Sequence, residues 1–311
     1  MPGSGVAPGE GVLQILVRRA KGCHNRQAER DSIGEMEGPV GRWLMWLAAA
    51  MLMADLPAEA APVRSGGKVD LVPHKATYDL RLGRVRSGGD VVGAKGSMVM
   101  ETAKSCAGWT LKHRFRLTLI NNEGNRIETN SDFSSFESID GLTYRFTSRT
   151  TRNGAVTDDV QGNARLASLG APGHADFTRP KGTLFDLPKG TIFPTEHVAQ
   201  LIAGARRGQR RVFKIIFDGQ SKDGALEVNA FIGGYLAQAP AKWAKNTLTN
   251  RPSWFLRLAF FPVGSSKAAP QHEAGLRIFD NGVADEFEWD WGTFTVEGTL
   301  KSLEALPRPK C

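Results

Sequence analysis

The sequence predicts an all-β domain with one packed helix, and three observations indicate this fold class. From about residue 72 onward, apolar and polar residues alternate with a period of two, which is the pattern of half-buried strands. Glycine and asparagine turn signals recur about every 10–15 residues, as in a continuous antiparallel meander. One stretch near residue 200 departs from this pattern, because its apolar residues recur with the period of a helix.

The segment before this domain has the features of an export signal. Arg42 precedes an apolar run at 43–53 (WLMWLAAAMLM), and Ala58-Glu59-Ala60 offers an A-x-A cleavage site. The run is too short to cross a bilayer, which needs about 20 residues. A buried core helix is the alternative interpretation. We expect a secretory signal peptide that is cleaved after Ala60, and therefore a periplasmic protein.

This signal sets the expected domain boundaries. Residues 36–60 form the expected signal peptide, and residues 61–311 form one β domain. Residues 1–35 are expected to be a non-native or disordered leader, because a signal peptide normally begins the chain. Met36 would then be the true start codon.

The strands are expected in two series, one on either side of the helix. Asn153-Gly154 marks a tight hairpin turn in the first series, and Asn281-Gly282 marks one in the second. The expected strands of the first series are 76–82, 109–119, 126–136, 142–152 and 155–169. Those of the second series are 212–218, 225–235, 254–262, 273–280, 283–291 and 293–306.

The helix is expected to begin near Pro194, since proline suits the first helical turn. An apolar stripe follows at i, i+3, i+4 and i+7, and Gly208 ends the pattern. A helix this short needs tertiary packing to persist. We expect the stripe to pack against the concave side of the sheet; it consists of Val198, Leu201, Ile202 and Ala205.

Composition and charge exclude several classes of protein. Of the 311 residues, 41% are hydrophobic and 23% are charged, which argues against a disordered, collagen-like or polytopic membrane protein. The net charge is +8. One dense basic run is either a solvated helix end or a contact for an anionic surface such as lipid phosphates; it contains Arg206, Arg207, Arg210 and Arg211. An exported protein is not expected to bind nucleic acid.

The cysteines predict one disulfide. Cys23 lies in the expected leader, which leaves Cys106 and Cys311. An even pair in an oxidising compartment usually forms a bond. A redox-active pair is the alternative, but no CxxC motif is present to lower a thiol pKa. We expect a bond that ties the C-terminal tail to a loop and leaves the last strand beside the strand that begins near Trp109.

The sequence contains little else that indicates catalysis. It has no G-x-S-x-G nucleophile motif, and no HxH or HExxH spacing for a metal. The histidines of the expected mature chain are scattered at His74, His113, His174, His197 and His272. We therefore predict no catalytic, cofactor-binding or metal-binding residues. Gly88-Gly89 and Gly233-Gly234 are expected to be turns or bulges, because neither pair opens a helix.

One expected strand carries two contrasting faces. Its acidic row is either a solvated outer face or a cation or acid/base site; it consists of Glu286, Glu288 and Asp290. Its aromatic row is either ordinary core or the lining of a ligand groove; it consists of Phe287, Trp289 and Trp291.

Several short motifs occur in an order that resembles one known family. They are HKATYDL at 74–80, GAKG at 93–96, CAGW at 106–109, FPTEH at 193–197, FDG at 217–219 and the terminal Cys311. On these motifs, residues 72–311 resemble the EipB-like cell envelope integrity proteins, which are periplasmic proteins of alphaproteobacteria. The resemblance implies a strongly bent, spiral-like antiparallel β-sheet wrapped partly around a helix. It also implies a disulfide between Cys106 and Cys311, and a role in the envelope with no established catalytic residues.

Three functional hypotheses follow. The first is a non-enzymatic, monomeric periplasmic protein that maintains envelope integrity by binding an envelope partner, without a cofactor. The second is a carrier of lipid or another hydrophobic molecule on the concave sheet face. The third is a hydrolase of envelope polymer that uses carboxylates such as Glu286 and Asp290.

Overall fold

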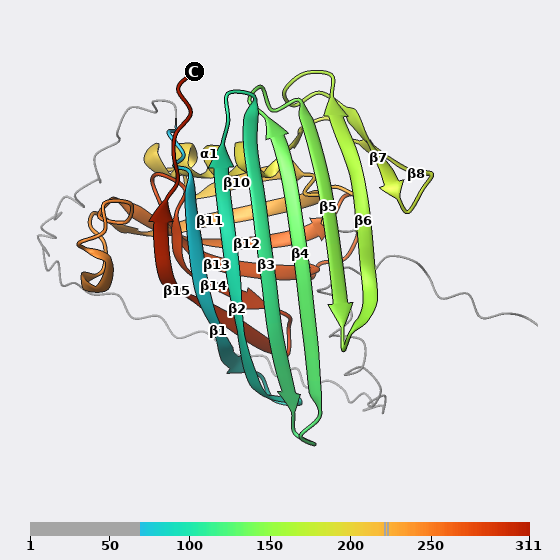
Figure 1. Cartoon of the computed structure of the whole chain (residues 1–311), viewed down its shortest axis with the longest axis vertical. Coiled ribbons are helices and arrows are strands. Elements are labelled where there is room, and N and C mark those ends of the chain that lie inside the picture. The colour runs from blue at the N-terminus through green and yellow to red at the C-terminus, as the bar shows by residue number, and fades with distance from the viewer. Residues whose placement is uncertain (1–68, 221, 223) are drawn as a thin grey trace, which may run out of the picture.

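One continuous sheet dominates the computed structural model, which describes residues 69–220, 222 and 224–311. Its 15 strands lie in the order β8-β7-β6-β5-β4-β3-β2-β1-β15-β14-β13-β12-β11-β10-β9. In Figure 1, β2 to β6 run down the front while β11 to β14 cross behind them, so the sheet bends back over itself. The predicted all-β, strongly bent sheet with one packed helix is confirmed. The expected leader and signal peptide lie outside the described residues.

The strands form two series joined by a helix. The first series is β1 (His74–Val85), β2 (Val91–Lys104), β3 (Gly108–Asn121), β4 (Arg126–Ser138), β5 (Thr143–Arg152), β6 (Ala155–Leu166), β7 (Gly173–Arg179) and β8 (Thr183–Leu187). After β9 (Thr191–Ile192) and α1 (Pro194–Arg206), the second series is β10 (Arg211–Ile216), β11 (Leu226–Leu236), β12 (Ser253–Pro262), β13 (His272–Phe279), β14 (Ala284–Asp290) and β15 (Phe294–Ala305). A short 3-10 helix, η2, spans Ala241–Trp243.

The expected uninterrupted antiparallel meander is wrong at one place. Strand β9 pairs with β10 in parallel, and α1 connects the two. Parallel neighbours cannot be joined by a tight hairpin and need a crossover, which the helix supplies. The two series meet where β15 pairs with β1 in antiparallel register.

Strands β2, β7, β8 and the two-residue β9 are absent from the sequence-based expectation. The sequence of β2, VVGAKGSMVMETAK, has no regular alternation because glycines interrupt it. Packing requires one of them, since a Cβ at Gly96 would lie 2.1 Å from the Arg116 carbonyl oxygen. Strands β7 and β8 are only 7 and 5 residues long, which is too short for a clear periodic signal.

Helix α1 packs inside the bend, as its apolar stripe predicts. Leu201 is 3% exposed and Ile202 is fully buried. They join a core cluster with residues of β10 to β13, and with Trp109 of β3. After the C-cap, Gly208 takes a φ of 74°, a left-handed conformation that favours glycine and ends the helix.

A carboxylate from a distant strand caps the N-terminus of α1. The N-cap residue, Phe193, makes no side-chain cap. Instead, the N–H groups of Thr195 and Glu196 donate to the two Glu137 carboxylate oxygens of β4, at 2.7 and 3.0 Å. Burial raises the pKa of Glu137 to about 7, although these hydrogen bonds act in the opposite direction. Glu137 therefore fixes one end of the helix to the first strand series.

Candidate functional site

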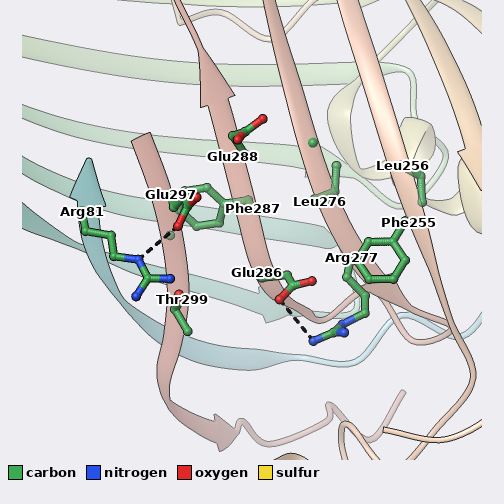
Figure 2. Close-up of a pocket in the computed structure, with 12 residues that line it drawn as sticks. Arg81, Phe255, Leu256, Leu276, Arg277, Glu286, Phe287, Glu288, Glu297 and Thr299 are labelled. Atoms are coloured by element: carbon green, nitrogen blue, oxygen red, sulfur yellow. Dashed lines mark hydrogen bonds and ion pairs between the residues drawn. The ribbon is translucent and has the colours of Figure 1, made fainter. Parts of the chain in front are cut away.

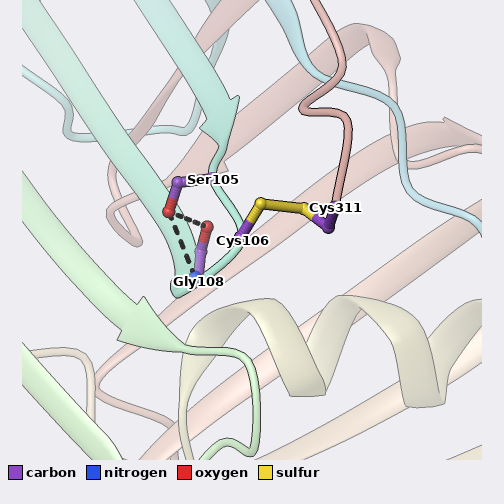
Figure 3. Close-up of a disulfide and its surroundings, with 4 residues drawn as sticks. All are labelled: Ser105, Cys106, Gly108 and Cys311. Carbon is purple, nitrogen blue, oxygen red and sulfur yellow. Dashed lines mark hydrogen bonds between the residues drawn. A yellow bond between two sulfur atoms is a disulfide. The ribbon is translucent and has the colours of Figure 1, made fainter.

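The disulfide joins the β2–β3 turn to the last residue of the chain (Figure 3). The Cα atoms of Cys106 and Cys311 lie 5.7 Å apart, 205 residues apart in sequence. The turn is held by Ser105, whose N–H donates to the Gly108 carbonyl at 2.8 Å and whose hydroxyl accepts from the Gly108 N–H at 3.2 Å. The pairing expected for Cys106 and Cys311 is present.

The neighbours of the last strand differ from expectation. Strand β15 lies between β1 and β14. Strand β3 is separated from β15 by β1 and β2. The disulfide therefore ties the tail after β15 to the β2–β3 turn without placing β15 beside β3. The tail has two further contacts: the Leu306 N–H donates to the Pro73 carbonyl, and Arg308 pairs with Asp70 at 2.9 Å.

The acidic row of β14 lies on the outer face of the sheet and is paired with arginines, which bury Asp290 to 4% exposure. Glu288 Oε1 accepts from Arg84 at 2.8 Å and from Arg257 at 2.9 Å. Asp290 Oδ2 accepts from Arg86 at 2.8 Å and from Arg257 at 3.2 Å. These contacts join β1, β12 and β14 across the outer face of the sheet.

The pKa values of Glu286 and Glu288 indicate whether these two carboxyls could act as an acid/base pair. Burial raises the pKa of Glu286, and Arg277 opposes that rise. Burial also acts to raise the pKa of Glu288, but the hydrogen bonds from Arg257 and Arg84 outweigh it, so the pKa is lowered. Opposite shifts are what an acid/base pair needs. However, two guanidinium groups hold Glu288, which favours a structural ion-pair network.

The aromatic row of β14 lies on the inner face, in the core. Trp291 belongs to the buried cluster around Tyr78 and Val296, and Phe287 and Trp289 pack against that cluster. The ring centroids of Phe287 and Tyr78 lie 5.1 Å apart in an edge-on contact. This row is therefore core packing.

A hollow of about 340 Å³ lies on the outer face beside the acidic row (Figure 2). Two cross-strand rows of side chains line it, and the register places each row across neighbouring strands. One row contains Phe255, Arg277, Glu286 and Thr299. The other contains Gly275, Glu288, Glu297 and Arg81. The sequence pattern singled out Glu286 and Glu288 but none of the residues that β12, β13, β15 and β1 contribute.

The histidines are not brought together. In the described part of the chain, no group of three or more His, Cys, Asp or Glu residues could hold a metal ion. His197 is 6% exposed in α1, and His113 stacks on Phe133 with ring centroids 5.0 Å apart. Burial lowers the pKa of His197 to about 3 and that of His113 to about 4, so both rings are neutral at pH 7.

The basic run beyond α1 is only partly available to a partner. Arg206 donates to the Asp280 carbonyl at 2.9 Å and is half-buried. Arg211 lies over the Phe231 ring, 5.4 Å from its centroid. Arg207, Arg210 and Arg211 are exposed. Among the described residues, no helix has both the length and the apolar character to span a membrane.

Gly233-Gly234 is a bulge, as expected: the β11–β12 register shifts between Gly233 and Leu236. Gly88 takes a φ of 83° in the β1–β2 turn. Both glycine pairs therefore serve the backbone geometry.

The bent sheet, its interior helix and the disulfide-tethered tail define a class of barrel-like β proteins that open between their edge strands. The chain belongs to the EipB-like family, whose model matches residues 65–307. It is 27% identical over 249 residues to the cell envelope integrity protein EipB of Brucella abortus (strain 2308), covering 79% of this chain and 88% of that protein. A crystal structure of a β-barrel-like protein of the domain of unknown function DUF1849 from Brucella abortus superposes with a TM-score of 0.70. That match has 28% identity and covers 77% of this chain and all of the other.

Proposed function

We propose that this protein maintains the integrity of the cell envelope as an exported, non-enzymatic protein that binds an envelope partner. The family match over residues 65–307, with a relative named for envelope integrity, carries this proposal. The geometry of the acidic row supports the non-enzymatic part. Glu288 accepts hydrogen bonds from two arginines, which lower its pKa and make it a poor proton acceptor.

The experiment is complementation of a gene deletion, scored as survival in detergent. The deletion strain is expected to be detergent-sensitive, and the intact gene to restore survival. Asp290→Asn tests the chemistry, because Asp290 belongs to the hydrolase hypothesis but does not line the outer-face hollow, and an amide cannot act as a general acid or base. Full restoration by this variant supports a binding role. Complete loss of survival with an unchanged melting temperature would support the hydrolase hypothesis instead.

Export is tested on the same strain. N-terminal sequencing of protein from the periplasmic fraction should begin at Ala61, because Ala58-Glu59-Ala60 is the expected cleavage site. A periplasmic protein that retains residues 1–60 would contradict this proposal. Mass spectrometry of the same sample tests the carrier hypothesis, which requires co-purified lipid at about one molecule per chain.

A further inference from the structure

Arginines pair with all the carboxylates that line the outer-face hollow. Arg81 pairs with Glu297 at 3.1 Å, Arg277 with Glu286 at 3.4 Å, and Arg257 with Glu288 at 2.9 Å. Each of the three lining carboxylates therefore has a guanidinium partner. An ionic ligand would have to displace one of these ion pairs, whereas a neutral ligand rich in hydroxyl groups finds acceptors and donors side by side.

Neither backbone conformation nor packing requires the glycine in the hollow. Gly275 lies inside β13, and its φ is outside the left-handed region. A Cβ at this position would lie 3.5 Å from Arg257 Nη1 and 3.9 Å from Glu288 Cβ, which are ordinary contacts. By contrast, a Cβ at Gly298 would lie 2.1 Å from the Phe287 ring. A glycine inside a strand often marks a site of close approach by another molecule.

An exposed aromatic ring forms one side of the hollow. Phe255 is 39% exposed, and the Arg277 guanidinium carbon lies 5.3 Å from its ring centroid. Asp285 holds that guanidinium in place, with Arg277 Nε donating to Asp285 Oδ1 at 2.7 Å. The exposed part of this ring, outside the Arg277 contact, offers an apolar surface to the C–H groups of a pyranose ring. Figure 2 shows Phe255, Arg277 and Glu286 on neighbouring strands.

From these observations we propose that the hollow binds a neutral saccharide unit of a glycan chain. Phe255 contacts the apolar face of the sugar, Gly275 leaves room for the sugar on the floor of the hollow, and the carboxylates and guanidinium groups form hydrogen bonds with its hydroxyls. The volume of about 340 Å³ is in the range of small-molecule sites. The biological role of this site rests on the proposed envelope function. Saccharide binding itself does not, because it is measured on the purified protein.

The test is a titration of the full ¹⁵N-labelled chain with tri-N-acetylchitotriose and, separately, with cellotriose. The first probe represents an N-acetylated glycan backbone and the second an unsubstituted hexose chain. We expect amide shifts confined to the strands that line the hollow, β12, β13, β14, β15 and β1, around Phe255, Gly275, Glu286 and Glu297 for at least one of them. A greater response to one probe identifies the type of glycan. No shift with either probe, or shifts elsewhere on the protein, would overturn the proposal.

Two variants and a matched control sharpen the test. Phe255→Ala should weaken binding about tenfold, which corresponds to about 1.4 kcal/mol. Gly275→Val should abolish binding because the valine side chain fills the hollow. Valine is also a residue that suits a strand. Phe213→Ala is the control, because Phe213 is a 53% exposed phenylalanine of β10 outside the hollow lining. Equal affinity in all three variants, with unchanged melting temperatures, would refute the site even if the deletion strain is detergent-sensitive.

Discussion

Two buried side chains on one face of α1 show what single residues contribute. His197 and Leu201 are one helical turn apart, and they are 6% and 3% exposed. Leu201 fills the core cluster between the helix and β10 to β13. His197 Nε2 is buried without a hydrogen-bond partner among the described residues. One residue therefore stabilises the fold by packing, whereas the other carries a polar group at a cost.

Replacing Leu201 should measure the packing of the helix. Leu201→Ala is expected to lower the free energy of unfolding by about 2–5 kcal/mol, through lost burial and the cavity left behind. Urea denaturation of the two proteins measures it. Val92→Ala is the control, because Val92 is 60% exposed. An unchanged denaturation midpoint for Leu201→Ala would show that the helix is peripheral.

Replacing His197 should change how stability depends on pH. Its pKa in the folded protein, about 3, lies below the ordinary 6.5, so its contribution to stability is present above pH 6.5 and is lost as pH falls toward 3. His197→Leu should lose less stability than the native protein between pH 6.5 and 4. It should also be as stable or more stable at pH 7, because a buried unpaired polar atom costs about 1–3 kcal/mol. Melting temperatures across this range, with the exposed His174→Gln as control, check both statements.

At the scale of elements, the contact between α1 and β4 is the most specific feature. Glu137 lies 58 residues before Thr195, so no local sequence signal marks it as a helix cap. It supplies two acceptors to the free N–H groups at the helix N-terminus, although burial opposes its ionisation. This contact fixes α1 to the first strand series, while its apolar face packs against the second.

Removing the Glu137 carboxylate should destabilise the protein. Glu137→Ala is expected to cost about 1–3 kcal/mol, because two helix N–H groups lose their acceptors. Glu137→Gln should cost less, and it should remove a pH dependence. The pKa of Glu137 in the folded protein, about 7, lies above the ordinary 4.5. Its contribution to the free energy of unfolding is therefore full below pH 4.5 and is lost as pH rises through 7. Glu128→Ala, an exposed change on the same strand, is the control; equal denaturation midpoints would contradict the cap.

In the whole molecule, two connections hold the beginning and the end of the β domain together. The β1–β15 pairing joins the two series into one sheet, and the Cys106–Cys311 bond ties the tail after β15 to the β2–β3 turn. The bond closes a loop of 205 residues, for which the chain-entropy model gives about 5 kcal/mol as an upper figure. The tail contacts with Pro73 and Asp70 already hold the ends close, so the measured contribution should be smaller.

The disulfide variants test this connection. Cys106→Ser, Cys311→Ser and the double variant should lower the melting temperature by similar amounts, because each removes the same bond. Arg308→Ala breaks only the exposed pair with Asp70. It should lower the free energy of unfolding by about 0–1 kcal/mol, and the melting temperature by less than the cysteine variants do. Free reaction of both thiols with a maleimide before reduction would show that the bond is absent from the native protein.

The sequence by itself determined the strand periods, the helix and its buried face, and the cysteine pair, because each depends on local periodicity or on parity. Val198 to Ala205 and Asn153-Gly154 could be interpreted without knowing the rest of the chain. Only the tertiary structure decided the parallel β9–β10 pair, the Glu137 cap and the outer-face hollow. Phe255, Gly275 and Glu297 lie on three different strands, and the register that aligns them depends on how the whole sheet bends. A period of two assigns a residue to a face of its own strand, but it does not specify its neighbours across the sheet.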